Sequence, residues 1–258
     1  MADRRQVLKG GIAAGAIGIA GWGILNVSTD SEEDPDPGPE NGEDSEDENG
    51  DGASVTLPSD SSELFTAGKL QEHNLKESSF TEEQIGDPVS EFDLANADTS
   101  NVETMERMFM WAESFNHDIG EWDTSNVETM AQMFAHAESF NQDIGGWDTN
   151  NVETMSSMFY DAESFDQDIG GWDTSNVETM RSMFGGHNVG AESFNQDIGD
   201  WDTSNVEDMR GMFASAHSFD QDLSGWCVEQ IAEKPHAFDF GAGFGGDDTK
   251  QPNWGEPC

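Results

Sequence analysis

Positive charge is the scarcest feature of this chain of 258 residues, which has 10 Lys and Arg against 54 Asp and Glu and a net charge of −44. No lysine occurs between Lys76 and Lys234, where the only cations are Arg107, Arg181 and Arg210. The negative electrostatic potential of such a chain makes nucleic acid and anionic membrane surfaces poor partners, and it favours cations and basic proteins. Near-molar salt, with a Debye length of roughly 3 Å, would remove most of the self-repulsion. We therefore expect a hypersaline habitat.

The chain also lacks the short motifs that carry common catalytic chemistry. It has no Gly-rich phosphate loop, no Gly-x-Ser-x-Gly nucleophile motif and no histidine pair at metal-ligand spacing. Acidic pairs occur throughout, so they do not distinguish a glycosidase from a solvated surface. We expect a protein that is not an enzyme and that has no cofactor.

Cysteine is limited to Cys227 and Cys258. Two cysteines without a nearby histidine pair argue against a zinc site. In an oxidising exterior they would form one disulfide that closes the C-terminal end. Two free buried thiols are the alternative.

The N-terminus predicts export. Arg4 and Arg5 precede an uncharged, Gly-rich apolar stretch at residues 10–25, a pattern that resembles a twin-arginine signal. We assign residues 1–27 to this signal or, if it is retained, to an N-terminal anchor, which would be the chain's one membrane contact. Residues 28–60 are acidic, rich in Pro and Gly, and predicted to be a disordered linker.

A repeat of 25 residues organises the rest of the chain, with one longer unit that contains an insertion. Its Phe, Trp and Met positions recur in phase, as in Phe115, Phe140, Phe165, Phe194 and Phe219. One unit cannot bury its own apolar face, whereas stacked units cover each other. We interpret these residues as core ladders; the alternative is an aromatic ligand box or a methionine site for copper.

Within one unit, apolar residues at positions 152, 155, 158 and 159 follow helical spacing, which predicts a helix over residues 152–160. The preceding F-N-Q-D-I-G-G-W segment predicts a short strand and a turn. The expected fold is therefore an α/β repeat, a leucine-rich-repeat-like solenoid of short strand-turn-helix units with N- and C-terminal caps. The caps would be residues 61–95, with a helix after Thr81, and residues 227–258, around a repeat solenoid at residues 96–226.

The unit D-I-G-x-W-D-T-S-N-V-E-T-M-x-x-M-F resembles that of the BspA family of leucine-rich-repeat surface proteins, also recognised as a domain of unknown function in mycoplasmas. The resemblance covers roughly residues 96–226, with Ile, Phe, Trp and Met at most core positions in place of Leu. It implies cell-surface display and adhesion or protein binding, and it brings no catalytic residues. The acidic composition fits an origin in a halophilic archaeon.

The units differ most between the predicted helix and the next strand, where an equal scaffold carries unequal side chains. This variation indicates a candidate binding face for an unknown protein or cell-surface glycan; its residues are Met110, Trp111, His136, Tyr160, Asp161, His187 and Asn188. Neutral drift on exposed turns is the alternative. A structural cell-envelope spacer, ordered by divalent cations, is the alternative function.

Aspartates also repeat in phase, as at Asp143, Asp168 and Asp197. Such columns either serve turns and helix starts and face solvent, or are bridged by calcium. Their spacing does not match a known calcium loop, so we expect no metal site, with calcium as the alternative.

Overall fold

The computed structural model describes residues 15–18, 24–28, 54–65, 94–187 and 189–257. It has a three-stranded antiparallel sheet of β1 (Gly15–Gly18), β2 (Ile24–Ser28) and β3 (Ser54–Thr56), in the order β1-β2-β3. Two 3-10 helices follow, η3 (Leu94–Asn96) and η4 (Asp248–Lys250). Within these ranges, no helix is long and apolar enough to cross a bilayer.

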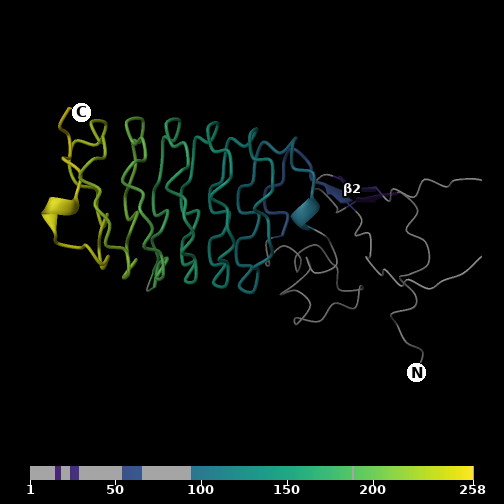
Figure 1. Ribbon diagram of the computed structural model, residues 1–258, viewed down its shortest axis with the longest axis horizontal. Coiled ribbons are helices and arrows are strands. Elements are labelled where there is room, and N and C mark those ends of the chain that lie inside the picture. Colours follow the sequence, from purple (N-terminus) through teal and green to yellow (C-terminus); the bar gives the residue numbers. More distant parts are fainter. Residues whose placement is uncertain (1–14, 19–23, 29–53, 66–93, 188, 258) are drawn as a thin grey trace, which may run out of the picture.

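The repeat units stack along one axis, so that each unit forms one layer of the elongated body in Figure 1. Isolated parallel bridges join equivalent residues of successive units; they run through Thr104, Thr129, Thr154, Thr179 and Asp208. Because only one residue per unit takes part, the bridges form a column of contacts and no extended strand.

The expected α/β architecture of strand-turn-helix units is wrong. From residue 94 to residue 257, with residue 188 excepted, the described chain has no α-helix and no sheet strand. The segment expected as a strand contains tight turns, with Gly145 N–H donating to Asp143 Oδ1 at 3.0 Å and Trp147 N–H donating to Ile144 O at 3.2 Å.

Positive backbone φ angles explain the missing helix. Within the segment expected to be helical and at the residue after it, φ is 55° at Ser157 and 54° at Asp161, whereas an α-helix needs about −63° throughout. Ser157 N–H donates to Arg181 O and Phe159 N–H to Met183 O, both in the next unit. The intervening N–H groups bond three residues back, as Tyr160 does to Ser157 O at 3.1 Å. The backbone therefore bonds sideways to its neighbours, and successive turns imitate helical spacing in the sequence.

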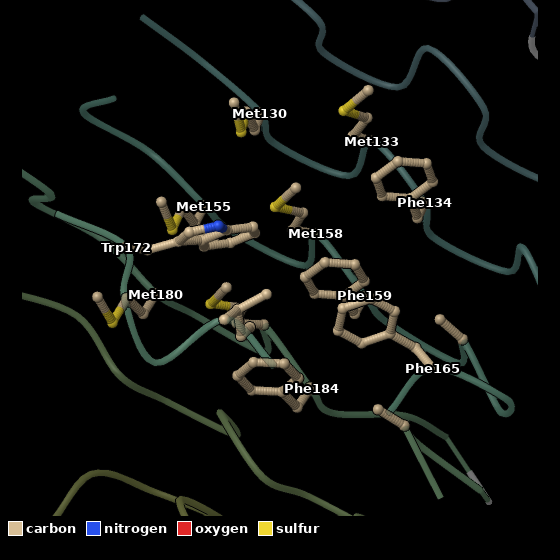
Figure 2. Close-up of a cluster of buried hydrophobic side chains, with 14 of the residues drawn as sticks. Met130, Met133, Phe134, Met155, Met158, Phe159, Phe165, Trp172, Met180 and Phe184 are labelled. Carbon is tan, nitrogen blue, oxygen red and sulfur yellow. The ribbon is translucent and has the colours of Figure 1, made fainter. Parts of the chain in front are cut away.

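The apolar residues of each unit form buried ladders, as predicted, although no helix carries them (Figure 2). Phe159 lies 5.7 Å from both Phe134 and Phe184, with near-parallel rings. Trp147 and Trp172 stack at 6.5 Å. These rings and the methionines beside them form one continuous linear core, since each side chain contacts its counterparts above and below.

Polar side chains also link the units. Trp172 Nε1–H donates to Ile144 O of the preceding unit at 3.1 Å, and the other repeat tryptophans do the same. The buried Thr149 hydroxyl donates to Asp173 O of the following unit at 2.9 Å. These bonds satisfy polar groups that stacking removes from water.

Both ends of the stack carry residues that depart from the repeat. At the N-terminal end Phe65 stacks on Phe109 at 5.3 Å, and at the C-terminal end Phe244 packs edge-on against Phe213 at 5.8 Å. The predicted helix after Thr81 lies outside the described residues. Cys227 is disulfide-bonded, but Cys258 also lies outside them, so its role as partner stays a prediction.

Candidate binding face

The outer turns of the stack bring equivalent positions of three successive units to the surface in a line. Trp111, His136 and Asp161 occupy this position in three successive units, each with positive φ. Their N–H groups donate to Ala135 O, Tyr160 O and Gly185 O, respectively, in the next unit. The scaffold therefore holds neighbouring side chains at the separation between layers.

Four of the predicted face residues form a continuous chain of two ring contacts and one hydrogen bond, which we call the aromatic row: Trp111, His136, Tyr160 and His187. The Trp111 and His136 rings are parallel within 5° at 3.6 Å, and His136 meets Tyr160 edge-on at 5.4 Å. Tyr160 Oη lies 3.2 Å from His187 Nδ1. Trp111 is 45% exposed, so the row opens to solvent.

Asp161 connects the aromatic row to the insertion in the longer unit. Its Oδ2 lies 3.4 Å from His136 Nδ1, and its Oδ1 accepts the Gly190 N–H at 3.2 Å. A Cβ at Gly186 would lie 2.0 Å from Asp161 Oδ1, so this glycine makes room for the carboxylate. The insertion is thus bonded to the row by two side chains, those of Asp161 and Tyr160.

Ionisation of the row follows from its partial burial. Burial lowers the pKa of His136, although the nearby carboxylates of Asp161, Glu138 and Glu113 oppose the shift. Burial, followed by the charge of Asp161, raises the pKa of Tyr160. Both shifts favour the uncharged form of the ring, at His136 and at Tyr160.

The other two predicted face residues are placed differently. Met110 is partly buried, and the ring contacts of the row do not involve it. Asn188 lies outside the described residues. The structure therefore brings four of the predicted residues into contact, and their role as a binding face stays a prediction.

A hollow next to Tyr160 was not predicted. It has a volume of about 410 Å³ and is open to solvent, and we call it the basic hollow because its lining includes Arg181, Arg210 and His236, together with Ser182 and Ala214. Arg210 is held by Asp208, with Nε donating to Oδ1 at 2.9 Å, and this bond lowers the pKa of Asp208. The sequence contains one indication of this hollow, because Arg181 and Arg210 occupy equivalent positions of adjacent units.

The repeated aspartates serve turns. Asp173 Oδ1 accepts the Ser175 hydroxyl at 2.6 Å and the Ser175 N–H at 3.0 Å, and these bonds lower the pKa of Asp173. Asp168 accepts the Gly170 N–H in the same way. In the part of the chain that the structure describes, no three His, Cys, Asp or Glu side chains gather into a group suited to a metal ion.

The repeat resemblance agrees with the comparison against known families. The family described as "Mycoplasma protein of unknown function, DUF285" matches residues 77–189 and 187–251, together more than half of the chain. No curated protein and no solved structure shows significant similarity to this chain. The chain therefore belongs to this mycoplasma-type family of BspA-like repeat proteins, whose function is unknown.

Proposed function

We propose that the chain is an exported, non-catalytic binding module of the cell surface, which recognises a protein or a glycan through the aromatic row. The observation that carries this proposal is the parallel stack of Trp111 on His136, half open to solvent at 45% exposure of the indole. Rigid aromatic side chains offer large contact areas at low entropic cost, which is why binding surfaces use them.

The rest of the row supports binding over a purely structural spacer. A spacer requires only that the units stack, and the interior ladders already provide this. The row instead joins unlike residues of successive units, Trp111, His136 and Tyr160, into one contiguous surface. A contiguous surface of unlike side chains that includes large aromatic rings is what recognition of a partner requires.

Export and salt adaptation complete the proposal. Arg4 and Arg5 before an apolar stretch favour a twin-arginine signal, and the acidic linker would hold the stack away from the envelope. The net charge of −44 favours a halophilic archaeon as the source, because concentrated salt screens the repulsion between carboxylates.

Affinity capture from envelope fractions, in salt that keeps the chain folded, tests the binding role. We expect the wild-type chain to retain a partner that the double variant Trp111→Ala/His136→Ala loses. Phe240→Ala serves as a matched control, because Phe240 is 72% exposed and lies outside the row. Capture no better than that of a protein of equal acidity, or equal capture by the double variant, would refute the proposal.

A further inference from the structure

The basic hollow stands out by its charge. Four of the Lys and Arg residues in the described ranges touch a carboxylate; the pairs are Arg107–Glu63, Arg210–Asp208, Lys234–Asp239 and Lys250–Asp220. Arg181 is the exception among the described residues, because its exposed guanidinium makes no ion-pair contact, although its charge contributes to lowering the pKa of Asp208. On a chain with a charge of −44, a cation without an ion-pair contact therefore lines the basic hollow.

The shape of the hollow results from small residues at positions that hold larger ones elsewhere. Gly186 occupies the position of Trp111 and His136 in earlier units, and Ala214 occupies that of Met110 and Tyr160. Gly211, with φ of 65°, likewise takes the place of Gln132. The stack is therefore undercut beside Tyr160, with Arg181 and Arg210 in the wall.

We propose that the basic hollow binds the carboxylate of a uronic-acid saccharide, with a neighbouring sugar ring lying on the aromatic row. This rests on the proposed binding role of the row and names its ligand class. A planar guanidinium such as that of Arg181 matches a carboxylate with two parallel hydrogen bonds. Tyr160 belongs to both surfaces, so an acid group in the hollow places the attached sugars beside the row.

The surface suits a saccharide better than an acidic peptide. Peptides that bind as an added strand need an exposed strand edge, and peptides that bind as a helix need a long apolar groove. The described repeat units have no sheet strand, and the hollow is lined in part by charged and polar side chains, with a volume in the usual range for small ligands. Aromatic faces such as Trp111 pack well against the C–H face of a sugar ring.

Calorimetric titration of the full chain with tetragalacturonate, and with its fully methyl-esterified form, tests this inference at one fixed salt concentration. We expect the acid to bind about tenfold or more tightly than the ester, because a charge-assisted bond is stronger than a neutral one. Arg181→Gln should remove this difference. Lys234→Gln makes the same charge change at an exposed site outside the hollow and should preserve it.

A second variant keeps the charge of the basic hollow and fills part of its volume. Ala214→Met introduces the side chain that the first unit carries at Met110, so the backbone is suited to it, and we expect it to weaken binding of the acid about as much as Arg181→Gln.

The inference is overturned by any of three results: no heat with millimolar tetragalacturonate, equal affinity for acid and ester, or equal effects of Arg181→Gln and Lys234→Gln. Tighter binding of hexaglutamate than of tetragalacturonate would assign the hollow to acidic peptides instead. A partner that is captured by wild type and by Arg181→Gln, but lost with Trp111→Ala/His136→Ala, would leave the row's function standing while this inference fails.

Discussion

The inside and the outer edge of the stack follow opposite rules of sequence. Inside, equivalent positions repeat the same side chain, as Phe134, Phe159 and Phe184 do, and each of these is fully buried. At the outer turns the equivalent residues are Trp111, His136 and Asp161, which share a backbone conformation and little else. An interior residue packs against the same residue type in the neighbouring units, so one packing arrangement repeats in every layer. An outer residue meets solvent on one side and is free to differ.

The largest effect should follow from breaking an interior ladder. Phe159→Ala removes a ring that contacts Phe134, Phe165 and Phe184, and we expect the free energy of unfolding to fall by about 3–5 kcal/mol. Denaturant unfolding in molar salt would measure it. Phe240→Ala, at a site 72% exposed, should change it by less than about 0.5 kcal/mol. Similar losses for both variants would contradict the distinction between inside and edge.

An intermediate effect should follow from removing one bond between units. Trp172→Phe keeps an aromatic ring but deletes the indole N–H that donates to Ile144 O at 3.1 Å. The buried carbonyl then lacks this partner, and we expect a loss of about 2 kcal/mol in unfolding free energy. Trp111→Phe deletes an exposed indole N–H for comparison. If both substitutions had the same small effect, the cross-unit bond would not contribute to stability.

A smaller effect on stability should accompany loss of the outer stack. Trp111→Ala removes the ring that lies 3.6 Å from His136, and we expect it to lower the unfolding free energy by less than about 1 kcal/mol while weakening partner binding about tenfold or more. Thermal melting and capture from envelope fractions would be measured on the same preparation. A large drop in melting temperature would show instead that the row supports the fold.

The smallest effect should be the pH response of the row. Because burial lowers the pKa of His136 in the folded state, the unfolded chain binds its proton more readily as pH falls through about 6.5. Stability should therefore be fully present above that pH and decrease slightly below it. His136→Gln should remove this part of the decrease between about pH 7 and 5, as measured by paired denaturant titrations. Identical pH profiles for the two proteins would contradict the assigned shift.

The sequence predicted which residues are buried better than it predicted their backbone conformation. Repetition of Val152, Met155 and Phe159 at a fixed phase requires that they face a common interior, and they do. Their spacing of three and four residues is shared by an α-helix and by successive three-residue turns. The positive φ at Ser157 and Asp161 and the hydrogen bonds from Ser157 and Phe159 to the next unit separate the two, and these residue types demand neither feature. The helix was wrong for that reason.

The candidate face was predictable to the extent that it depends on variation between units. Trp111, His136, Tyr160 and His187 were identified as unequal side chains on equal turns, and the structure brings them into contact. The basic hollow could not be predicted in this way, because it forms where the larger side chains of other units are absent. Gly186 and Ala214 carry no chemical signal by themselves, and their effect appears only when they are placed beside Tyr160 and Arg181.

The tryptophan bonds between layers have a consequence for how such a chain changes length. Trp172 reaches Ile144 across 28 residues, and Trp201 reaches Ile169 across 32, yet both bonds measure 3.1 Å. The four additional residues are accommodated at the outer turn and leave the junction between layers unaltered. If a whole number of units is duplicated or deleted, the two units that become neighbours therefore form the same junction between layers. Tandem duplication or deletion can lengthen or shorten the array without a new packing problem, while the outer turns of each copy diverge.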